Sequence, residues 1–442
     1  MEALTSYSLL LASTDLFSSY NLIIGASVVI ILSFFFGELS KKTNIPSVLM
    51  LIILGIVIKI GLDSMTEQTP DFHAYLEVLG IVGLIMIVLE AALELKLERE
   101  KLIPIVKAFT IALIGLILSA WAAAALLHQF IPEMTMQKAW IYATPISILS
   151  SAIIIPSVSG LRHDKKEFHI YESTFSDILG IMMFYFLVAP FENGGEATGF
   201  LAFGGNIVLT IVLSLIASYA IVIIFQRIET HVKLFLLIAV LLLLYAIGKK
   251  MHLSSLIIIL VFGLVIANMK LFFKGTMSHF LDKKHADEIY EGLHVVTMET
   301  AFVVRTFFFV VFGLTIVLSS LASTKVAMIS LLIILSIYVI RYLTLRLFIG
   351  KDILPQLFIA PRGLITVLLF YAIPTGATVA GFESGILLFI IIGTSVIMTF
   401  AMISDKRRTN SAVREAKSQP VGYVKWEAPT VGEGSVAKES QH

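Results

Sequence analysis

Cysteine is absent from the 442 residues of the sequence. Its absence excludes disulfides, thiolate metal sites and cysteine nucleophiles. Charge is scarce as well: Asp, Glu, Lys and Arg make up only 14% of the chain, and the formal net charge is +1. A charge so close to balance gives no sign of a nucleic-acid partner.

The sequence is rich instead in apolar residues, which make up 58% of the chain against about 45–50% in ordinary globular proteins. The mean hydropathy is +0.94. No soluble fold has an interior large enough to hide this fraction, so the excess must face lipid. We therefore expect an all-α polytopic membrane protein rather than a soluble enzyme, a secreted disulfide scaffold or a disordered chain.

Because a spanning helix needs about 20 apolar residues, the chain has room for many spans. We expect thirteen, at about 21–38, 45–61, 74–97, 102–128, 139–160, 169–189, 200–226, 232–248, 253–269, 292–318, 324–350, 354–376 and 383–403.

The basic residues of the loops predict the orientation, because cytoplasmic loops carry an excess of Lys and Arg. With the N-terminus outside, the cytoplasmic loops hold most of them, while the loops at 62–73, 190–199 and 377–382 hold none. The pair Lys249–Lys250 is the exception. We expect a multi-pass protein of the inner or plasma membrane whose C-terminus is cytoplasmic.

Three regions follow from this reading. Residues 1–20 form a short extracytoplasmic lead without the basic residues of a signal peptide. Residues 21–403 form the membrane transport domain. Residues 404–442 are polar and are expected to be a disordered cytoplasmic tail.

Ionisable residues inside spans are the first functional candidates, since each costs at least about 2.5–3.5 kcal/mol on insertion scales. Opposite charges are nearly balanced among them, which indicates pairing. They are Glu90 and Glu94 in span 3, Glu172 and Asp177 in span 6, Arg305 in span 10, Arg341 in span 11 and Arg362 in span 12. The histidines His163, His169 and His285 are expected in solvated cytoplasmic loops.

Prolines mark a second feature, because internal prolines kink or break helices. Span 5 contains Pro145 and Pro156, and span 12 contains Pro361 and Pro374. Such breaks survive at membrane depth only where they line a polar cavity or are buried in protein. Lipid-facing prolines in ordinary tilted helices are the alternative.

The two broken spans hold matching places in the chain. Each is the fifth of six if spans 1–6 and 8–13 are two repeats and span 7 is a linker. An offset of seven spans makes the two repeats run in opposite directions. Two interrupted crossing helices in inverted six-helix repeats are typical of a secondary transporter that binds its substrate between them.

Span 6 carries the oxygen chemistry. Ser173 and Asp177 lie four residues apart and so share one helix face. A carboxylate with neighbouring hydroxyls suits a small hard cation. The same carboxylate can bind a proton instead of the cation, but it cannot bind the proton and the cation at once. With one exchanging carboxylate, one monovalent cation trades for one proton and no net charge moves. The alternative is that Asp177 is an ordinary packing residue.

Five motifs in order resemble the monovalent cation–proton antiporter superfamily, in particular its bacterial sodium or potassium–proton exchangers. The resemblance covers about residues 21–403. The segment 172–177 is similar to the family's Glu-Ser-x-x-Asn-Asp motif, and the segment 360–363 is similar to its Pro-Arg-Gly segment. The remaining three are Asn44-Ile45-Pro46, the segment 89–94, and Arg305-Thr306-Phe307-Phe308-Phe309.

The resemblance implies a homodimer, an elevator-like movement and a set of residue roles. Asp177 would bind the monovalent cation or the proton, with Ser173 and Ser176 as further ligands. Glu172 and Arg362 would form an ion pair that braces the broken helix. In the same way, Arg305 would stabilise the crossed helices, together with Glu90.

Two departures from the family pattern concern the ligands. Ser176 stands where the family has asparagine, and the Thr-Asp pair expected at the break in span 5 is missing. Thr144-Pro145 and Ser150-Ser151 are the two candidate registers for that pair. The position of Pro156 favours Ser150-Ser151, and both registers stay open.

The leading hypothesis is therefore an antiporter that exchanges sodium for protons electroneutrally and needs no cofactor beyond its transported ions. Arg305 stands where electrogenic relatives commonly have a lysine, and an arginine stays charged at any relevant pH. The alternatives are potassium–proton exchange, and an uncoupled channel or sensor on the same fold. We do not expect an enzyme, because the sequence lacks the second intramembrane aspartate or the His-Glu-x-x-His motif that a membrane hydrolase would need.

Overall fold

The computed structural model describes residues 19–43, 45–65, 73–97, 101–192, 200–228, 233–251, 255–273, 283–316 and 323–418. Within these ranges all regular structure is helical, which confirms the all-α class. The chain divides into two units, residues 1–403 and 404–442. Of the expected N-terminal lead, residues 19 and 20 open the first helix, and the rest lies outside the described residues.

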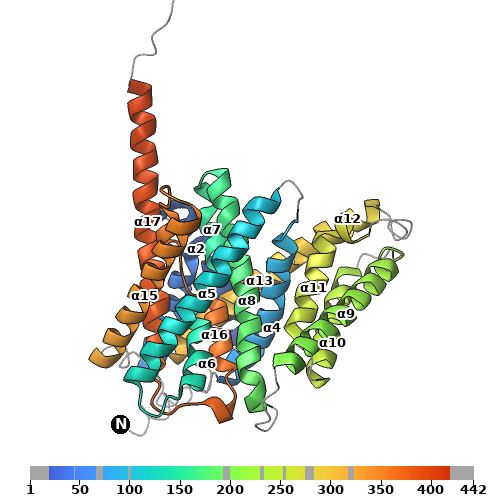
Figure 1. Cartoon of the computed structure of the whole chain (residues 1–442), viewed down its shortest axis with the longest axis horizontal. Coiled ribbons are helices and arrows are strands. Elements are labelled where there is room, and N and C mark those ends of the chain that lie inside the picture. The colour runs from blue at the N-terminus through green and yellow to red at the C-terminus, as the bar shows by residue number, and fades with distance from the viewer. Residues whose placement is uncertain are drawn as a thin grey trace, which may run out of the picture. The chain divides into compact units, whose positions relative to one another are not determined.

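The helices follow one another along the chain, and each expected span overlaps a helix, while the spans expected at 139–160 and 354–376 are interrupted (Figure 1). They are α2 (Ser19–Thr43), α3 (Ser47–Met65), α4 (His73–Glu94), α5 (Leu102–Phe130), α6 (Met136–Ser147), α7 (Ser151–Ser157), α8 (His163–Glu192), α9 (Phe200–Phe225), α10 (Lys233–Lys250), α11 (Ser255–Ala267), α12 (Met269–Phe272), α13 (Lys283–Thr315), α15 (Thr324–Phe348), α16 (Leu364–Tyr371) and α17 (Gly385–Ser418).

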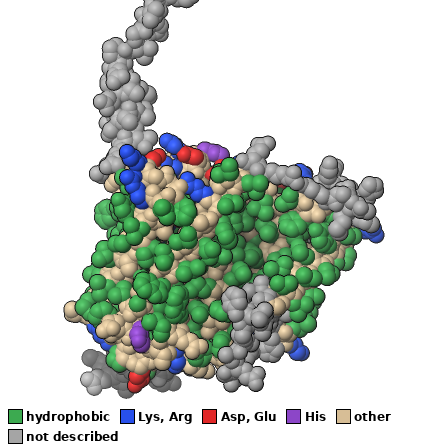
Figure 2. Space-filling view, viewed as in Figure 1, with side chains coloured by type: hydrophobic (Ala, Val, Ile, Leu, Met, Phe, Trp, Pro, Cys, Tyr) green, Lys and Arg blue, Asp and Glu red, His purple; other side chains and the backbone are tan. Residues whose placement is uncertain are grey.

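Nine segments among the described residues are long and apolar enough to cross a membrane, and α11 is a shorter apolar helix. Large hydrophobic side chains remain exposed on their outer faces, as on α2, where Phe34 and Phe35 are 61% and 60% exposed. Figure 2 shows hydrophobic side chains across the middle of the visible face, with charged side chains at its two margins. The protein is thus an integral membrane protein, while the count of thirteen spans and the inverted repeats stay predictions.

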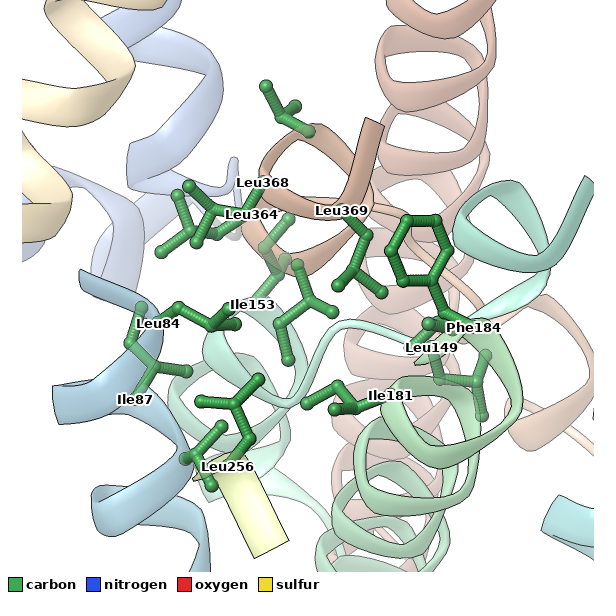
Figure 3. Close-up of a cluster of buried hydrophobic side chains, with 14 of the residues drawn as sticks. Leu84, Ile87, Leu149, Ile153, Ile181, Phe184, Leu256, Leu364, Leu368 and Leu369 are labelled. Carbon is green, nitrogen blue, oxygen red and sulfur yellow. The ribbon is translucent and has the colours of Figure 1, made fainter. Parts of the chain in front are cut away.

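Helix α8, which carries the motif segment 172–177, is surrounded by other helices (Figure 1). It packs against α5, α6 and α7, and it also contacts α4, α11 and α16. Figure 3 shows how apolar side chains from these elements meet around the broken segment. They include Ile87 of α4, Ile153 of α7, Ile181 of α8 and Leu368 of α16. This contact fixes the position of α7 by close packing, which drives helix association where lipid surrounds the protein.

The two interruptions predicted from the prolines are present. In the first, α6 ends at Ser147, the next three residues are not helical, and α7 begins at Ser151. In the second, residues 359–363 form an extended segment that leads into α16. The two segments cross, because the backbone N–H of Ser150 donates to the carbonyl oxygen of Pro361 at 3.0 Å. Each break thereby supplies a partner for the other's backbone.

The last helix is longer than expected. Helix α17 continues past residue 403 to Ser418, so the prediction of a disordered tail is wrong for residues 404–418. The reason lies in the sequence, which has no glycine or proline between Gly393 and Pro420 to end the helix. Residues 419–442 lie outside the described residues.

Candidate functional site

The motif segment of span 6 lies within the unbroken helix α8. Glu172, Ser173, Ser176 and Asp177 are all at most 2% exposed. Ser173 and Asp177 are four residues apart and share one face, while Glu172 and Ser176 share the neighbouring face. The helix therefore presents two different sets of polar groups to two different surroundings.

Asp177 lines a small cavity within the helical domain. Side chains of α4, α11 and α16 line the rest of it, and its volume of about 10 Å³ is close to that of a single water site. Asp177 is the one ionisable residue among its described lining residues. The others are Ile87, Val88, Ala91, Ile178, Ile181, Met182, Leu256, Ile257, Leu260 and Ile365.

The carboxyl group of Asp177 has little to neutralise it. Ser151, the first residue of α7, presents its hydroxyl and its backbone N–H to this group. Within the part of the chain that the structure describes, neither carboxyl oxygen has a partner at hydrogen-bond distance. A buried, unpaired carboxylate is costly. The described residues therefore leave a charge on Asp177 uncompensated.

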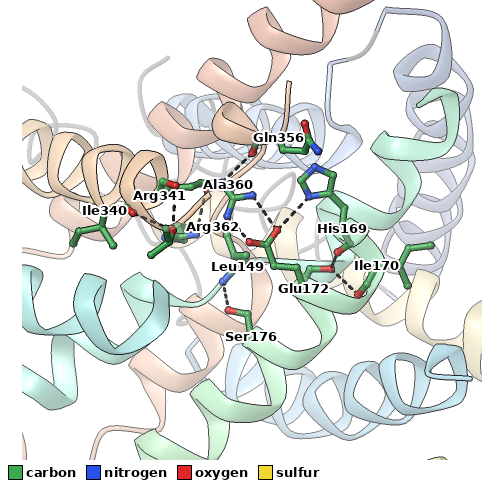
Figure 4. A network of polar contacts seen from close by, with 12 residues as sticks. Leu149, His169, Ile170, Glu172, Ser176, Ile340, Arg341, Gln356, Ala360 and Arg362 are labelled. Carbon is green, nitrogen blue, oxygen red and sulfur yellow. Dashed lines mark hydrogen bonds and ion pairs between the residues drawn. The ribbon is translucent and has the colours of Figure 1, made fainter. Parts of the chain in front are cut away.

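The two serines of the motif make different hydrogen bonds. The hydroxyl of Ser173 donates to the carbonyl oxygen of His169 at 2.7 Å, which leaves its own oxygen able to accept or to ligate. The hydroxyl of Ser176 accepts from the backbone N–H of Leu149 at 3.0 Å (Figure 4). Ser173 thus remains beside Asp177, whereas Ser176 ties α8 to the break between α6 and α7.

The structure also places the two candidate registers of span 5. Ser150 is the last residue of the break and Ser151 opens α7, so this pair lies at the interruption and brings Ser151 to Asp177. Thr144 lies inside α6, about one turn before the break, and its hydroxyl donates to the carbonyl oxygen of Trp140 at 2.7 Å.

Glu172 has a different cationic partner from the one expected. Nη1 and Nη2 of Arg341 donate to its two carboxylate oxygens at 2.8 and 3.0 Å (Figure 4). Both side chains are buried, at 1% and 8% exposure. Nε of Arg341 also donates to the carbonyl oxygen of Gln356 at 3.0 Å. Arg341 therefore links α15, the motif helix and the loop that leads to the second break.

The expected ion pair between Glu172 and Arg362 is wrong for this structure. Nε of Arg362 donates instead to the carbonyl oxygen of Ile146 at 2.7 Å. In a continuous helix that carbonyl would accept from Ser150, whose N–H is directed to Pro361. Because the end of a helix leaves carbonyls unpaired and carries partial negative charge, α6 provides a suitable place for the guanidinium.

His169 is likewise not the solvated loop residue that we expected. It lies within α8, is fully buried, and its Nδ1 is 3.4 Å from Oε2 of Glu172. His163, at 82% exposure, is solvated as expected, while His285 lies in α13. The spacing of three residues between His169 and Glu172 is the signal that could have placed them on one helix face.

Arg305 and Glu90 meet as the resemblance implied. Nη2 of Arg305 lies 3.2 and 3.0 Å from the two carboxylate oxygens of Glu90. Its Nη1 donates to the carbonyl oxygen of Ala152 at 3.2 Å. One side chain thus connects α13, α4 and the start of α7, close to the crossing of the two breaks.

A buried carboxylate beside two crossed, interrupted segments in a helical membrane domain is the arrangement of a secondary active transporter. The family described as "Sodium/hydrogen exchanger, transmembrane" matches residues 27–406. The chain belongs to this sodium/hydrogen exchanger family, and the predicted superfamily is confirmed.

Solved structures agree on the fold. The chain is similar to the structure at pH 8 of the sodium proton antiporter MjNhaP1 from Methanocaldococcus jannaschii, with a TM-score of 0.63 and 20% identity over 87% of this chain and 98% of that one. An electron-microscopy structure of the same antiporter gives a TM-score of 0.61 and 18% identity over 93% and 100% of the two chains. None of the curated proteins matches the sequence.

The pair between Glu172 and Arg341 generates a stability prediction. We expect Glu172→Gln to lower the free energy of unfolding by about 3–5 kcal/mol, because it leaves a buried guanidinium without its counter-charge. Adding Arg341→Met should recover much of this loss, since the uncompensated charge is then gone. Thermal unfolding of the detergent-solubilised variants measures both effects. Equal stability of Glu172→Gln and the wild type would show that the pair is not what holds α8 to α15.

Proposed function

We propose that this protein is an antiporter that exchanges one monovalent cation, with sodium favoured, for one proton at Asp177. The observation that carries the proposal is a carboxyl group that is 2% exposed, lines a small cavity and has no hydrogen-bond partner among the described residues. Membership of the sodium/hydrogen exchanger family supports monovalent cation–proton antiport.

The proposed cation ligands come from both sides of the break. Asp177 supplies the charge, and the hydroxyl oxygens of Ser151 and Ser173 supply neutral ligands of the kind that small hard cations prefer. Ser150 and Ser176 act differently in this proposal. Their contacts with Pro361 and Leu149 hold the break in place, so they position the ligands.

Exchange follows from the cost of the empty carboxylate. With a proton or a cation bound, the site is neutral and can pass through the apolar interior. An empty site carries an uncompensated charge, and a penalty of about 3 kcal/mol would suppress its crossing more than a hundredfold. The two ions then compete for one carboxylate, and each cycle moves one of each in opposite directions without net charge.

Arg305 fits this electroneutral cycle. Its guanidinium is engaged by Glu90 and by the carbonyl of Ala152, and an arginine keeps its proton at any relevant pH. It therefore carries no second proton across the membrane. Its proposed part is to stabilise the crossed helices together with Glu90, as the resemblance implies.

The movement that we propose is of the elevator type. Both breaks are fastened to their neighbours, since Leu149 is bonded to α8 and Ser150 to the segment before α16. These elements can move together with Asp177. We further propose a homodimer in the cell membrane, as the resemblance implies. Its N-terminus would lie outside and its C-terminus in the cytoplasm, as the loop charges predict.

Potassium is the second candidate cation. The break in span 5 contains hydroxyls and no carboxylate, so a single charge holds the ion. An oxygen-lined site with one charge does not by itself fix the size of the ion. The choice between sodium and potassium therefore depends on how closely Ser151 and Ser173 approach Asp177 when the cation is bound.

Removal of the carboxylate tests the proposal. We expect Asp177→Asn to reduce exchange at least hundredfold in proteoliposomes that contain an internal pH dye, because an amide can neither take up the proton nor neutralise the cation. The exposed Asp63 provides the matched control, and Asp63→Asn should exchange like the wild type. Wild-type exchange in Asp177→Asn would overturn the assignment.

Ion substitution and voltage test the finer claims. Sodium added to proteoliposomes with an acidic interior should dissipate the pH gradient at a lower concentration than potassium does. The rate should not change when a potassium-independent membrane potential of either sign is imposed, since one cation and one proton cancel. A flux that a membrane potential alone can reverse would contradict the single-carboxylate cycle.

A further inference from the structure

Three consecutive residues of the first break are each held by a separate contact. The side chain of Ile148 packs against Gly180 of α8. The backbone N–H of Leu149 donates to the hydroxyl of Ser176. That of Ser150 donates to the carbonyl of Pro361. The break is thus a fixed piece of backbone that ends directly at Ser151, the neighbour of Asp177.

Gly180 is where α8 contacts the side chain of Ile148. A Cβ atom at position 180 would overlap Cγ1 and Cδ1 of Ile148 and would lie 3.4 Å from its Cβ. Ile148 is itself 1% exposed, and its β-branched side chain has few alternative rotamers. A methyl group on residue 180 therefore requires the side chain of Ile148 to move away from α8, and we expect the backbone that carries it to follow.

The sequence spacing connects this contact to the exchanging carboxylate. Ser176 and Gly180 are four residues apart, so both face the break, and Asp177 lies between them on the neighbouring face. Ile148 precedes Ser151 by only three residues, and the intervening residues are fixed. Displacing Ile148 must either stretch the hydrogen bond from the N–H of Leu149 to the hydroxyl of Ser176 or shift Ser151 relative to Asp177.

We infer that Gly180 is a positioning residue: by accommodating Ile148 it sets the separation of Ser151 from Asp177, and thereby the affinity for the transported cation. This inference rests on the proposed function. The effect distinguishes the two transported ions. A cation needs several oxygen ligands at once, whereas a proton needs only the carboxyl group.

The test is the kinetics of exchange by Gly180→Ala in proteoliposomes, measured at alkaline pH where proton competition is weakest. We expect the apparent KM for sodium to rise about tenfold or more, while the rate at saturating sodium stays within about threefold of the wild type. A merely structural defect would instead lower the amount of active protein and leave KM unchanged. Gly25 has open space around its Cα, so Gly25→Ala is the matched control and should retain the wild-type KM.

The double variant Ile148→Ala with Gly180→Ala shows whether the effect passes through this contact. Truncation of Ile148 removes the atoms that the new methyl group would overlap, so the apparent KM should return close to the wild-type value. If Gly180→Ala alone prevents folding, Ile148→Leu takes its place, because it reshapes the same contact without adding atoms, and it should also raise the KM.

The outcomes separate the two claims. A wild-type protein that shows no exchange refutes the proposed function, and the inference with it. An active wild type with an unchanged KM in Gly180→Ala, or in Ile148→Leu where that variant is used, refutes the inference alone. An equal rise in KM in the single and the double alanine variants also refutes it, since the effect would then not depend on Ile148.

Discussion

A carboxylate that is shut away from water inside a membrane domain has to be neutralised, and this constraint organises the structure around Asp177. Removing an ion from water costs several kcal/mol even after a protein relaxes around it. Among the described residues, the fold brings only the hydroxyl and the backbone N–H of Ser151 and apolar side chains to this carboxyl group. In the function that we propose, the neutralising charge is supplied from solution, as a proton or as a cation, and coupled exchange follows from that requirement.

The other intramembrane charges are compensated by groups of the protein itself. Glu172 is held by both terminal nitrogens of Arg341, and Glu90 by Arg305. Arg362 is satisfied by a carbonyl that the end of α6 leaves free. Among the buried carboxylates of the described residues, Asp177 alone has both oxygens without a partner. The paired charges hold helices together, and Asp177 is left for the proposed exchange.

The sequence was sufficient where one physical cost dominates. Excess apolar surface required a membrane, and prolines required interruptions. The cost of buried charge gave seven ionisable residues within spans, among which the neighbouring hydroxyls and the family resemblance indicated Asp177. The position of the first break needed coordinates, because Thr144-Pro145 and Ser150-Ser151 both satisfied the pattern.

The partner of Glu172 could not be predicted for a related reason. Arg341 and Arg362 both lie inside spans, and the choice between them depends on helix rotation and on where α6 stops. His169 was misplaced because it lies at the expected edge of a span, where one further turn of helix changes a solvated residue into a buried one. The last helix extends beyond residue 403 because local propensity there continues after the apolar run ends. Each of these features is set by tertiary context or by a helix boundary.

The central claim is that the cation and the proton compete for Asp177, and proton release on cation binding tests it most directly. Purified protein in a weakly buffered detergent solution would be mixed with sodium chloride or with choline chloride while a pH dye is followed. At a pH where Asp177 is mostly protonated, sodium at saturation should release close to one proton per chain, and choline should release none. Sodium binding without proton release, or the same release from Asp177→Asn, would contradict the account.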